Sequence, residues 1–188
     1  MVMRRKNLLK YLPYEYKKSI SDIDYLNLKT LGYDTIFFDL DNTIADYETH
    51  RPTSVAIDLF KTIKDLGFKI YILTNNTKKR IRKFESELGI KCFESLRKPF
   101  TSKLKRRIRE HNIETSHVIW IGDQVVTDVR CAYTFNIDSI LVDPIKPSTE
   151  KWYTKINRFF ERRLIKKIKK NYPLEYNKLG LDERYGNN

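Results

Sequence analysis

The chain has 188 residues, with 37 Lys or Arg against 24 Asp or Glu, so its formal net charge is +13. This length suits a single domain with a substantial core and short extensions. No apolar run approaches the roughly 20 residues that a membrane-spanning helix needs, and charged residues interrupt the N-terminal stretch before a signal-peptide core forms. Cys92 and Cys131 lack metal-ligand spacing, which excludes a thiolate zinc site and predicts inert core thiols in a cytoplasmic protein.

The excess positive charge lies in two flanking segments. Residues 1–18 contain six Lys or Arg and one Glu, whereas residues 146–170 contain ten Lys or Arg and two Glu. Such segments favour an anionic partner, which includes lipid headgroups, nucleic acid and ribonucleoprotein surfaces. A role in solubility alone remains the alternative.

In chain order, residues 1–32 are expected to be a basic N-terminal extension, with a short amphipathic helix broken near Pro13 and a turn or helix over 19–28. From residue 33, strands and helices alternate over short connections, which predicts an α/β fold with a mostly parallel sheet. Short apolar runs rich in β-branched and aromatic residues predict the strands, at 36–38, 68–73, 90–93, 117–121 and 139–142. The helices between them are expected to end near 66, 88, 111 and 135.

The end of the chain divides into two parts. Residues 146–170 predict a basic amphipathic helix, because apolar residues recur at helical spacing at 153, 156, 160, 164 and 168. A basic helix with aromatic side chains suits an anionic lipid surface. Packing of the same helix on the core, with its charged side in water, is an equally compatible alternative. Residues 171–188 are expected to be a polar tail without fixed structure.

Polar side chains follow several of the predicted strands. Asp39 and Asp41 come directly after the run Ile36–Phe38, and the carboxyl ends of parallel strands meet at one edge of a sheet. Neighbouring carboxylates repel one another unless a cation lies between them. Carboxylates together with an ammonium and a hydroxyl suit Mg²⁺ with a phosphate beside it. The residues expected to join Asp39 and Asp41 at this edge are Thr74, Lys98, Asp123 and Asp128.

These motifs resemble, in order, the four motifs of the haloacid dehalogenase-like (HAD) phosphohydrolases. They are the run 39–43 (Asp-Leu-Asp-Asn-Thr), Thr74, Lys98 before Pro99, and Gly122-Asp123 with Asp128. Each motif alone is a weak signal, so their order and their positions at strand ends carry the resemblance, which covers residues 33–145. It implies a Rossmann-like three-layer α/β/α sandwich. The intervals between motifs leave no room for an inserted cap domain, so we expect a capless core with an open site.

The resemblance also implies a role for each residue. Asp39 would attack phosphorus and form an aspartyl-phosphate, and Asp41 would act as general acid and then general base. The phosphoryl group would be held by Thr74, Asn75 and Lys98, and Mg²⁺ would be held or supported by Asp39, Asp41, Asp123 and Asp128. For Thr74 and Asp128, a helix cap and a helix-surface charge remain the alternatives.

The chain further resembles the YqeG-type branch of bacterial HAD phosphatases, through residues 12–13, 19–23 and 122–128 and through the basic tail. That branch is similar to the phosphatidylglycerophosphate phosphatases of phosphatidylglycerol and cardiolipin synthesis. The resemblance therefore implies a phosphorylated lipid headgroup as substrate, and a peripheral position on the cytoplasmic face of a membrane through residues 1–18 and 146–170. Two alternatives stay open: a capless HAD phosphatase acting on a phosphoprotein or a nucleic-acid end, and an RNA- or ribosome-associated binding protein. The oligomeric state is left open.

Overall fold

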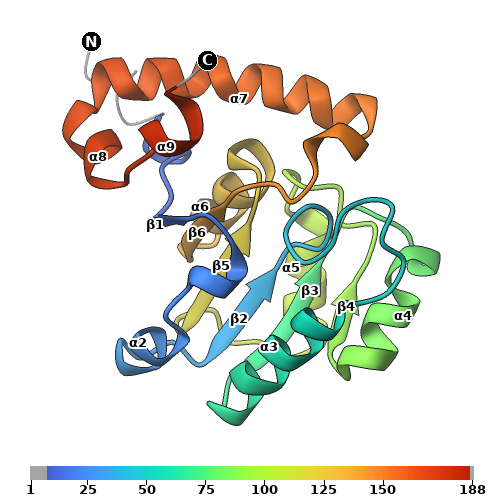
Figure 1. The fold of residues 1–188 in the computed structure, drawn as a ribbon. Coiled ribbons are helices and arrows are strands. Elements are labelled where there is room, and N and C mark those ends of the chain that lie inside the picture. Colours follow the sequence, from blue (N-terminus) through green and yellow to red (C-terminus); the bar gives the residue numbers. More distant parts are fainter. Residues whose placement is uncertain (1–7, 187–188) are drawn as a thin grey trace.

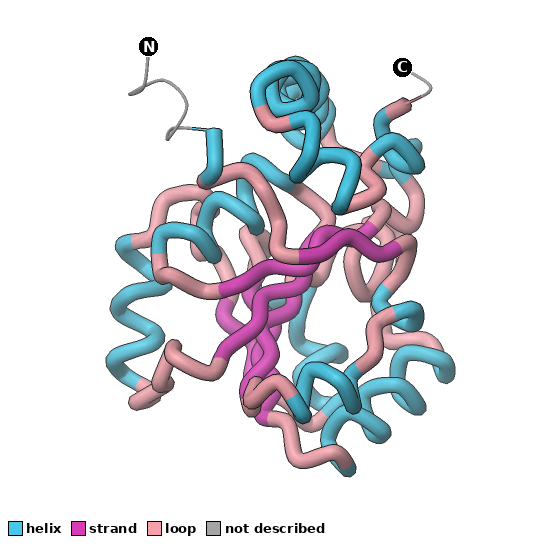
Figure 2. Tube along the Cα trace, turned by 90° about the vertical axis from the view of Figure 1, so that its left-hand side faces the viewer, coloured by secondary structure: helices cyan, strands magenta, loops and turns pink. Residues whose placement is uncertain are grey.

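The computed structural model describes residues 8–186, in which one six-stranded sheet lies between layers of helices (Figures 1 and 2). The strands are β1 Glu15–Lys17, β2 Thr35–Phe38, β3 Lys69–Leu73, β4 Lys91–Phe93, β5 Val118–Gly122 and β6 Asp138–Val142. The helices are α2 Tyr25–Thr30, α3 Ser54–Asp65, α4 Lys78–Leu88, α5 Ser102–Glu110, α6 Arg130–Thr134, α7 Trp152–Asn171, α8 Pro173–Lys178 and α9 Asp182–Tyr185. The α/β class predicted from the sequence is confirmed.

All neighbouring strands pair in parallel, in the order β1-β6-β5-β2-β3-β4. The chain runs from β2 to β3 and β4 on one side, and β5 and β6 lie on the other. Strand β2 is therefore the point at which the direction of winding reverses, and ligands of open α/β sheets bind beyond the strand ends at such a point. The pairing places the end of β2 directly between the ends of β3 and β5.

Helices cover both faces of the sheet, and successive residues of each strand point to opposite faces, so each of the strands β2 to β5 contributes to two apolar clusters. Ile36 and Phe38 of β2 pack with Phe60 of α3 and Phe84 of α4 on one face. On the other face, Phe37 belongs to a second cluster with side chains of β5, α5 and α6. Full burial of such a side chain stabilises the fold by about 1.5–3 kcal/mol, so this run anchors the centre of the domain.

The N-terminal extension adds a strand that the sequence analysis did not include. Glu15–Lys17 form β1 and pair with β6, and the backbone N–H of Tyr14 donates to the carbonyl of Ser139 at 2.8 Å. Without β1, the edge of β6 would expose unpaired backbone groups. A 3₁₀ turn, Ile20–Asp22, and helix α2 follow; a turn or helix is expected over 19–28, and α2 extends two residues further, to Thr30. The part of the predicted basic extension in residues 1–7 lies outside the described residues.

The C-terminal part is more ordered than its composition indicated. Helix α7 lies across the end of the sheet at which the strands finish (Figure 1). Where a polar tail without fixed structure was expected, α8 and α9 turn back against α7, with Tyr176 and Leu181 buried. The third apolar cluster joins these two residues to Ile165 and Ile168 of α7 and to Leu141 of β6. Within residues 8–186, none of the helices combines the length and apolar character required to cross a membrane.

Candidate active site

The carboxylates after β2 are positioned by a tight turn. The backbone N–H of Asp39 donates to the carbonyl of Ile121 at 2.9 Å, which continues the β2–β5 pairing by one residue. Asn42 then adopts a left-handed conformation with φ of 67°, which asparagine tolerates better than most residues. Its N–H donates to the carbonyl of Ala45 at 2.7 Å and closes the turn. Asp39 and Asp41, which lie between the end of β2 and this turn, are both buried.

A buried ion-pair cluster joins the ends of β2 and β5 to the segment after β4. The ammonium of Lys98 donates to Asp39 Oδ1 at 2.6 Å, to Asp128 Oδ1 at 2.7 Å and to the carbonyl of Leu73 at 2.8 Å. Burial opposes the charged form of this lysine, but Asp128 and Asp39 outweigh burial and raise the pKa of Lys98. The ammonium therefore stays protonated at neutral pH.

The pKa of Asp39 is raised well above its usual range. Burial is the main cause, the neighbouring Lys98 opposes it, and the charges of Asp128, Asp123 and Asp41 add to it. A carboxylate in this position is costly unless further positive charge is supplied. The site therefore favours an additional cation.

One oxygen of each of Asp39, Asp123 and Asp128 lies within 4.8 Å of the other two. Asp123 Oδ1 is buried and has no hydrogen-bond partner among the described residues. Burial, with a contribution from Asp128 and against the effect of Arg158, raises the pKa of Asp123 to about 6. Buried polar atoms are normally paired, so this free oxygen fits a metal ligand. Carboxylate oxygens are the donors that hard divalent cations prefer.

The balance of charged side chains around the site also favours the binding of a divalent cation. Six acids and four bases here have side chains no more than 15% exposed, and the acids exceed the bases by the charge of one divalent cation. They are Asp39, Asp41, Asp123, Asp128, Glu150 and Glu161 against Arg80, Lys98, Arg158 and Arg184.

Asp128 can lie against strand β5 because Gly122 has no side chain. A Cβ at that position would lie 2.5 Å from Asp128 Cγ, far inside van der Waals contact. The other oxygen of Asp128, Oδ2, accepts from the N–H of Gln124 at 3.1 Å and from the hydroxyl of Thr127 at 3.2 Å. These contacts leave Asp128 as a fixed support beside Asp39 and Asp123.

Asp41 faces a different set of partners. Its Oδ2 accepts from the hydroxyl of Thr74 at 3.2 Å and from the amide of Asn76 at 3.3 Å. Its Oδ1 accepts from Arg80 Nε at 3.1 Å, and the same guanidinium donates to the backbone carbonyls of Asp46 and Thr49. Arg80 was not predicted, because it is one of several basic residues on α4 and no spacing distinguishes it from the others.

The side chain of Asn75 is engaged with the backbone of Lys98. Its Nδ2 donates to the Lys98 carbonyl at 2.9 Å, and the Lys98 N–H donates to its Oδ1 at 2.5 Å. Asn75 therefore holds the segment that carries Lys98 against the end of β3. A direct contact between Asn75 and a phosphoryl group stays a prediction.

Five of the predicted residues line a cavity of about 50 Å³: Asp39, Asp41, Thr74, Asn75 and Lys98. Asp123 and Asp128 are buried beside Asp39 and do not line it. Helix α7 contributes the other side of the cavity with Tyr153, Thr154 and Asn157, and Thr154 lies within hydrogen-bond distance of the hydroxyl of Tyr47. The core has no inserted cap among the described residues, as expected. The cavity is nevertheless less open than the short intervals between motifs indicated, because the C-terminal segment covers part of it.

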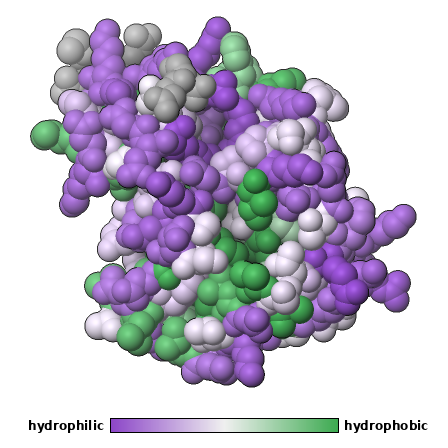
Figure 3. All heavy atoms as spheres, viewed as in Figure 1, coloured by the Kyte–Doolittle hydropathy of each residue, from purple (hydrophilic) through white to green (hydrophobic). Residues whose placement is uncertain are grey.

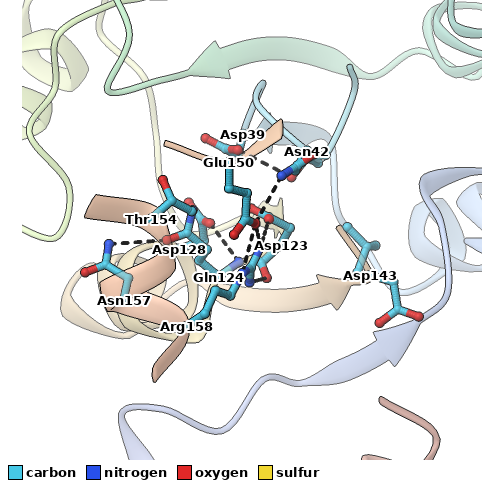
Figure 4. A network of polar contacts seen from close by, with 12 residues as sticks. Asp39, Asn42, Asp123, Gln124, Asp128, Asp143, Glu150, Thr154, Asn157 and Arg158 are labelled. Atoms are coloured by element: carbon cyan, nitrogen blue, oxygen red, sulfur yellow. Dashed lines mark hydrogen bonds and ion pairs between the residues drawn. The ribbon is translucent and has the colours of Figure 1, made fainter. Parts of the chain in front are cut away.

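The C-terminal segment also supplies buried ionic residues, which sequence reasoning missed. Figure 4 shows Arg158 and Glu150 beside Asp123, together with Asn42, whose amide donates to Glu150 Oε1 at 3.1 Å. From the sequence alone, Arg158 is one of ten basic residues in the segment 146–170, which is predicted to be an amphipathic helix. In the sequence, Arg158 differs from the other basic residues of the helix only in that Glu161, the one acidic residue between 152 and 171, follows it by three positions. This spacing places both side chains on the same side of a helix.

Comparisons with known proteins place the chain among HAD-like phosphatases. The HAD-hydrolase-like family model matches residues 95–146. The probable phosphatase YqeG of Bacillus subtilis is 31% identical over 166 residues, covering 88% of this chain and 96% of that protein. Phosphatidylglycerophosphate phosphatase 1 of Arabidopsis thaliana, chloroplastic/mitochondrial, is 23% identical over 167 residues; the match covers 83% of this chain and 47% of that protein, about half its length.

An uncharacterized protein from Listeria monocytogenes serotype 4b has a similar fold, with a TM-score of 0.50 and 17% identity over 63% of this chain and 85% of that one. The fold and the site define a phosphoric monoester hydrolase of the HAD-like class. Within that class, the chain belongs to the family of the YqeG phosphatase.

Proposed function

We propose that this protein is a Mg²⁺-dependent phosphatase that acts on phosphatidylglycerophosphate through an aspartyl-phosphate formed on Asp39. The observation that carries the proposal is the meeting of three strand ends at one buried cluster, in which Lys98 contacts both Asp39 and Asp128 and Asp123 presents a free oxygen. This cluster combines a nucleophile and a fixed ammonium, which both line the cavity, with further carboxylate oxygens buried beside them.

In the first step, a carboxylate oxygen of Asp39 attacks phosphorus and the bond to the alcohol oxygen breaks. Asp41 gives its proton to that oxygen, so the alcohol leaves neutral. Thr74, Asn75 and Lys98 hold the phosphoryl oxygens during transfer, and the ammonium of Lys98 balances their charge. Lys98 already contacts Asp39, which places its charge beside the attacking atom.

In the second step, a water molecule attacks phosphorus and gives its proton to Asp41. The bond to Asp39 breaks, inorganic phosphate leaves, and both carboxyl groups return to their initial states. Asp39, Asp123 and the carbonyl of Asp41 would hold Mg²⁺, and Asp128 would support them. When bound, the ion neutralises carboxylate and phosphoryl charge and acts as a Lewis acid.

The lipid substrate is supported by the name of the Arabidopsis relative and by the surface of α7. Trp152, Phe159 and Phe160 are each more than half exposed on this helix, among basic residues that include Arg163, whose guanidinium lies 4.3 Å from the Phe159 ring centroid. Figure 3 shows exposed apolar side chains among hydrophilic ones at the upper edge, where Figure 1 places α7. Basic and aromatic residues together favour an anionic lipid surface.

We therefore extend the proposal to a peripheral position on the cytoplasmic face of a membrane, with α7 in contact with the lipid. In this arrangement, the wall of the cavity formed by Tyr153, Thr154 and Asn157 belongs to the same helix as the lipid-facing residues. A phosphorylated headgroup at the surface would then lie near the catalytic cluster. The basic N-terminal segment, residues 1–18, is proposed to contact the same lipid surface. The structure describes residues 8–18 of this segment.

The activity is tested by phosphate release from phosphatidylglycerophosphate in mixed micelles with and without Mg²⁺. We expect turnover that requires the metal and is abolished by Asp39→Asn, which removes the nucleophile while keeping its shape. Asp34→Asn is the matched control, because Asp34 lies exposed before the start of the same strand. Turnover by Asp39→Asn at the wild-type rate would overturn the mechanism.

The substrate is tested with the same preparation on a phosphopeptide and on a 5′-phosphorylated oligonucleotide. If Mg²⁺-dependent hydrolysis is confined to one of these two substrates, the proposed mechanism stands and the lipid is not the substrate. Salt-sensitive RNA binding without phosphate release from any of the three would favour the binding protein instead.

The lipid surface is tested by sedimentation with vesicles of phosphatidylglycerol and phosphatidylcholine. We expect binding to the anionic vesicles, weakened by Phe159→Ser with Phe160→Ser and by high salt. Leu174→Ser is the control, because Leu174 is 81% exposed on α8. Equal loss of binding with the control would contradict the proposed surface.

A further inference from the structure

The two carboxylate oxygens of Asp123 have different surroundings. Oδ1 is buried, has no hydrogen-bond partner among the described residues, and belongs to a carboxylate of the acidic cluster with Asp39 and Asp128. Oδ2 accepts from Arg158 Nη2. A carboxylate held by one oxygen has little freedom to rotate, so the contact at Oδ2 fixes the direction of Oδ1.

Arg158 contacts Asp123 twice through its guanidinium. Besides the contact at Oδ2, its Nη1 donates to the backbone carbonyl of Asp123 at 2.7 Å. Along the adjacent edge of the guanidinium, Nε and Nη2 donate to Glu150 Oε1 at 3.0 and 2.8 Å (Figure 4). The planar guanidinium makes such a two-sided arrangement, which the single ammonium of a lysine cannot reproduce.

The helices after residue 150 hold this arginine in place. Glu161, on the next turn of α7, is fully buried, and its Oε1 accepts from Arg158 Nη1 at 3.4 Å. The same oxygen accepts from Tyr185 at 2.6 Å and from Arg184 at 3.2 Å. Its Oε2 accepts from the backbone N–H of Val125 at 2.8 Å, in the segment that follows Asp123. The C-terminal segment is therefore bonded directly to the backbone on which Asp123 and Asp128 are carried.

We infer that Arg158 is a positioning residue that directs Asp123 Oδ1 toward the metal, and that the segment from residue 150 onward thereby completes a site otherwise built from residues 39–128. The inference rests on the proposed Mg²⁺-dependent function. Residues that orient a metal ligand from behind commonly change metal affinity by about 10–100-fold when altered.

The test measures the Mg²⁺ dissociation constant by titration calorimetry, together with the melting temperature of the metal-free protein. Arg158→Lys keeps the positive charge and removes the two-sided contact, so we expect the dissociation constant to rise by about tenfold or more. Arg184→Lys is the matched control: the Arg184 side chain is 6% exposed and also donates to the Asp123 carbonyl, but not to the Asp123 carboxylate. It should lower the melting temperature and weaken Mg²⁺ binding less than Arg158→Lys does.

Two further variants complete the set. Arg162→Lys, at an exposed position on α7, should change neither quantity. Glu150→Gln removes the charge that holds Arg158 from its other side, so it should weaken Mg²⁺ binding in the same direction and carries the test if Arg158→Lys does not fold.

The outcomes separate this inference from the proposed function. Wild-type affinity in both Arg158→Lys and Glu150→Gln would overturn the positioning role and leave the phosphatase proposal intact. Equal weakening in Arg184→Lys would also overturn it, because a general loss of structure would then explain the effect. Absence of Mg²⁺ binding by the wild-type protein would overturn the proposed metal chemistry and the inference together.

Discussion

Replacing Lys98 with methionine would remove the positive charge at the centre of the site while keeping an unbranched side chain of similar length. The Lys98 side chain is 2% exposed, and its ammonium lies 2.6 Å from Asp39 and 2.7 Å from Asp128. The substitution leaves two buried carboxylates without their shared partner. Within residues 8–186, Lys98 is the one basic side chain that forms an ion pair with Asp39 or Asp128.

Breaking a buried ion pair by removing one partner costs about 3–5 kcal/mol of folding free energy. For a chain of this size, 1 kcal/mol lowers the melting temperature by about 2–4 °C, so we expect Lys98→Met to lower it by roughly 6–20 °C. The double variant Lys98→Met with Asp128→Asn removes one stranded charge as well. Because residues in contact couple by about 0.5–3 kcal/mol, the double variant should lose less stability than the sum of the two single variants.

The assay is urea unfolding and thermal melting in EDTA, near neutral pH. Lys105→Met is the matched control, because Lys105 is exposed on α5 and its replacement should change stability by no more than about 0.5 kcal/mol. A Lys98→Met protein that unfolds like the control, or a double variant that loses the full sum, would refute the cluster as the source of this energy.

Three further results are expected. Gly122→Ala should cost about 1–3 kcal/mol through overpacking and displace Asp128, since the added carbon would lie 2.5 Å from Asp128 Cγ; unfolding and phosphate release measure both effects, and wild-type values would contradict the close approach. Burial raises the pKa of Cys92 and of Cys131 to about 12, so neither should react with a thiol reagent near pH 8 until the protein is unfolded; rapid reaction of the native protein would disprove this. Burial raises the pKa of Asp123 to about 6, so the metal-free protein loses stability as the pH rises from the pKa of Asp123 in the unfolded chain to its pKa in the folded protein. Because Mg²⁺ binds the ionised carboxylate, the rise in melting temperature on adding Mg²⁺ should grow between about pH 5 and 7. A rise that does not change with pH would contradict this.

The central strands and the residues at their ends could be predicted from local sequence. Thr35–Phe38 and Val118–Gly122 are short apolar strands, every residue of which is buried, and such strands have a pattern that periodicity detects. Asp39 and Asp123 adjoin the ends of these strands, so their positions follow from the parallel order of the sheet. Lys98 was harder to place, because its position depends on the chain after β4 rather than on a strand end.

The two chain extensions could not be predicted in the same way. Strand β1 has three half-buried residues and no apolar run, so its structure depends on pairing with β6, which sequence periodicity does not contain. The α8–α9 region is polar on average, and its order comes from a few apolar residues, such as Tyr176 and Leu181, that meet α7. Average composition conceals contacts of this kind.

Arg80 and Arg158, which lie outside the motifs, could not be predicted as site residues for a different reason. Arg80 and Arg158 lie on helices with many basic residues, and whether a basic side chain points to the site or to water depends on how its helix packs. The contacts with Asp41 and Asp123 join positions 39 and 35 residues apart. Tertiary packing alone selects these two arginines from their neighbours.

The most direct test of the central claim is a crystal structure of the protein with Mg²⁺ and trifluoroberyllate, which mimics a phosphoryl group on a carboxylate and needs no knowledge of the natural substrate. We predict that beryllium is bonded to a carboxylate oxygen of Asp39, that Mg²⁺ contacts Asp39 and Asp123 Oδ1, and that Lys98 contacts a fluorine. Beryllium bound to another carboxylate, or Mg²⁺ bound away from Asp123, would contradict the account.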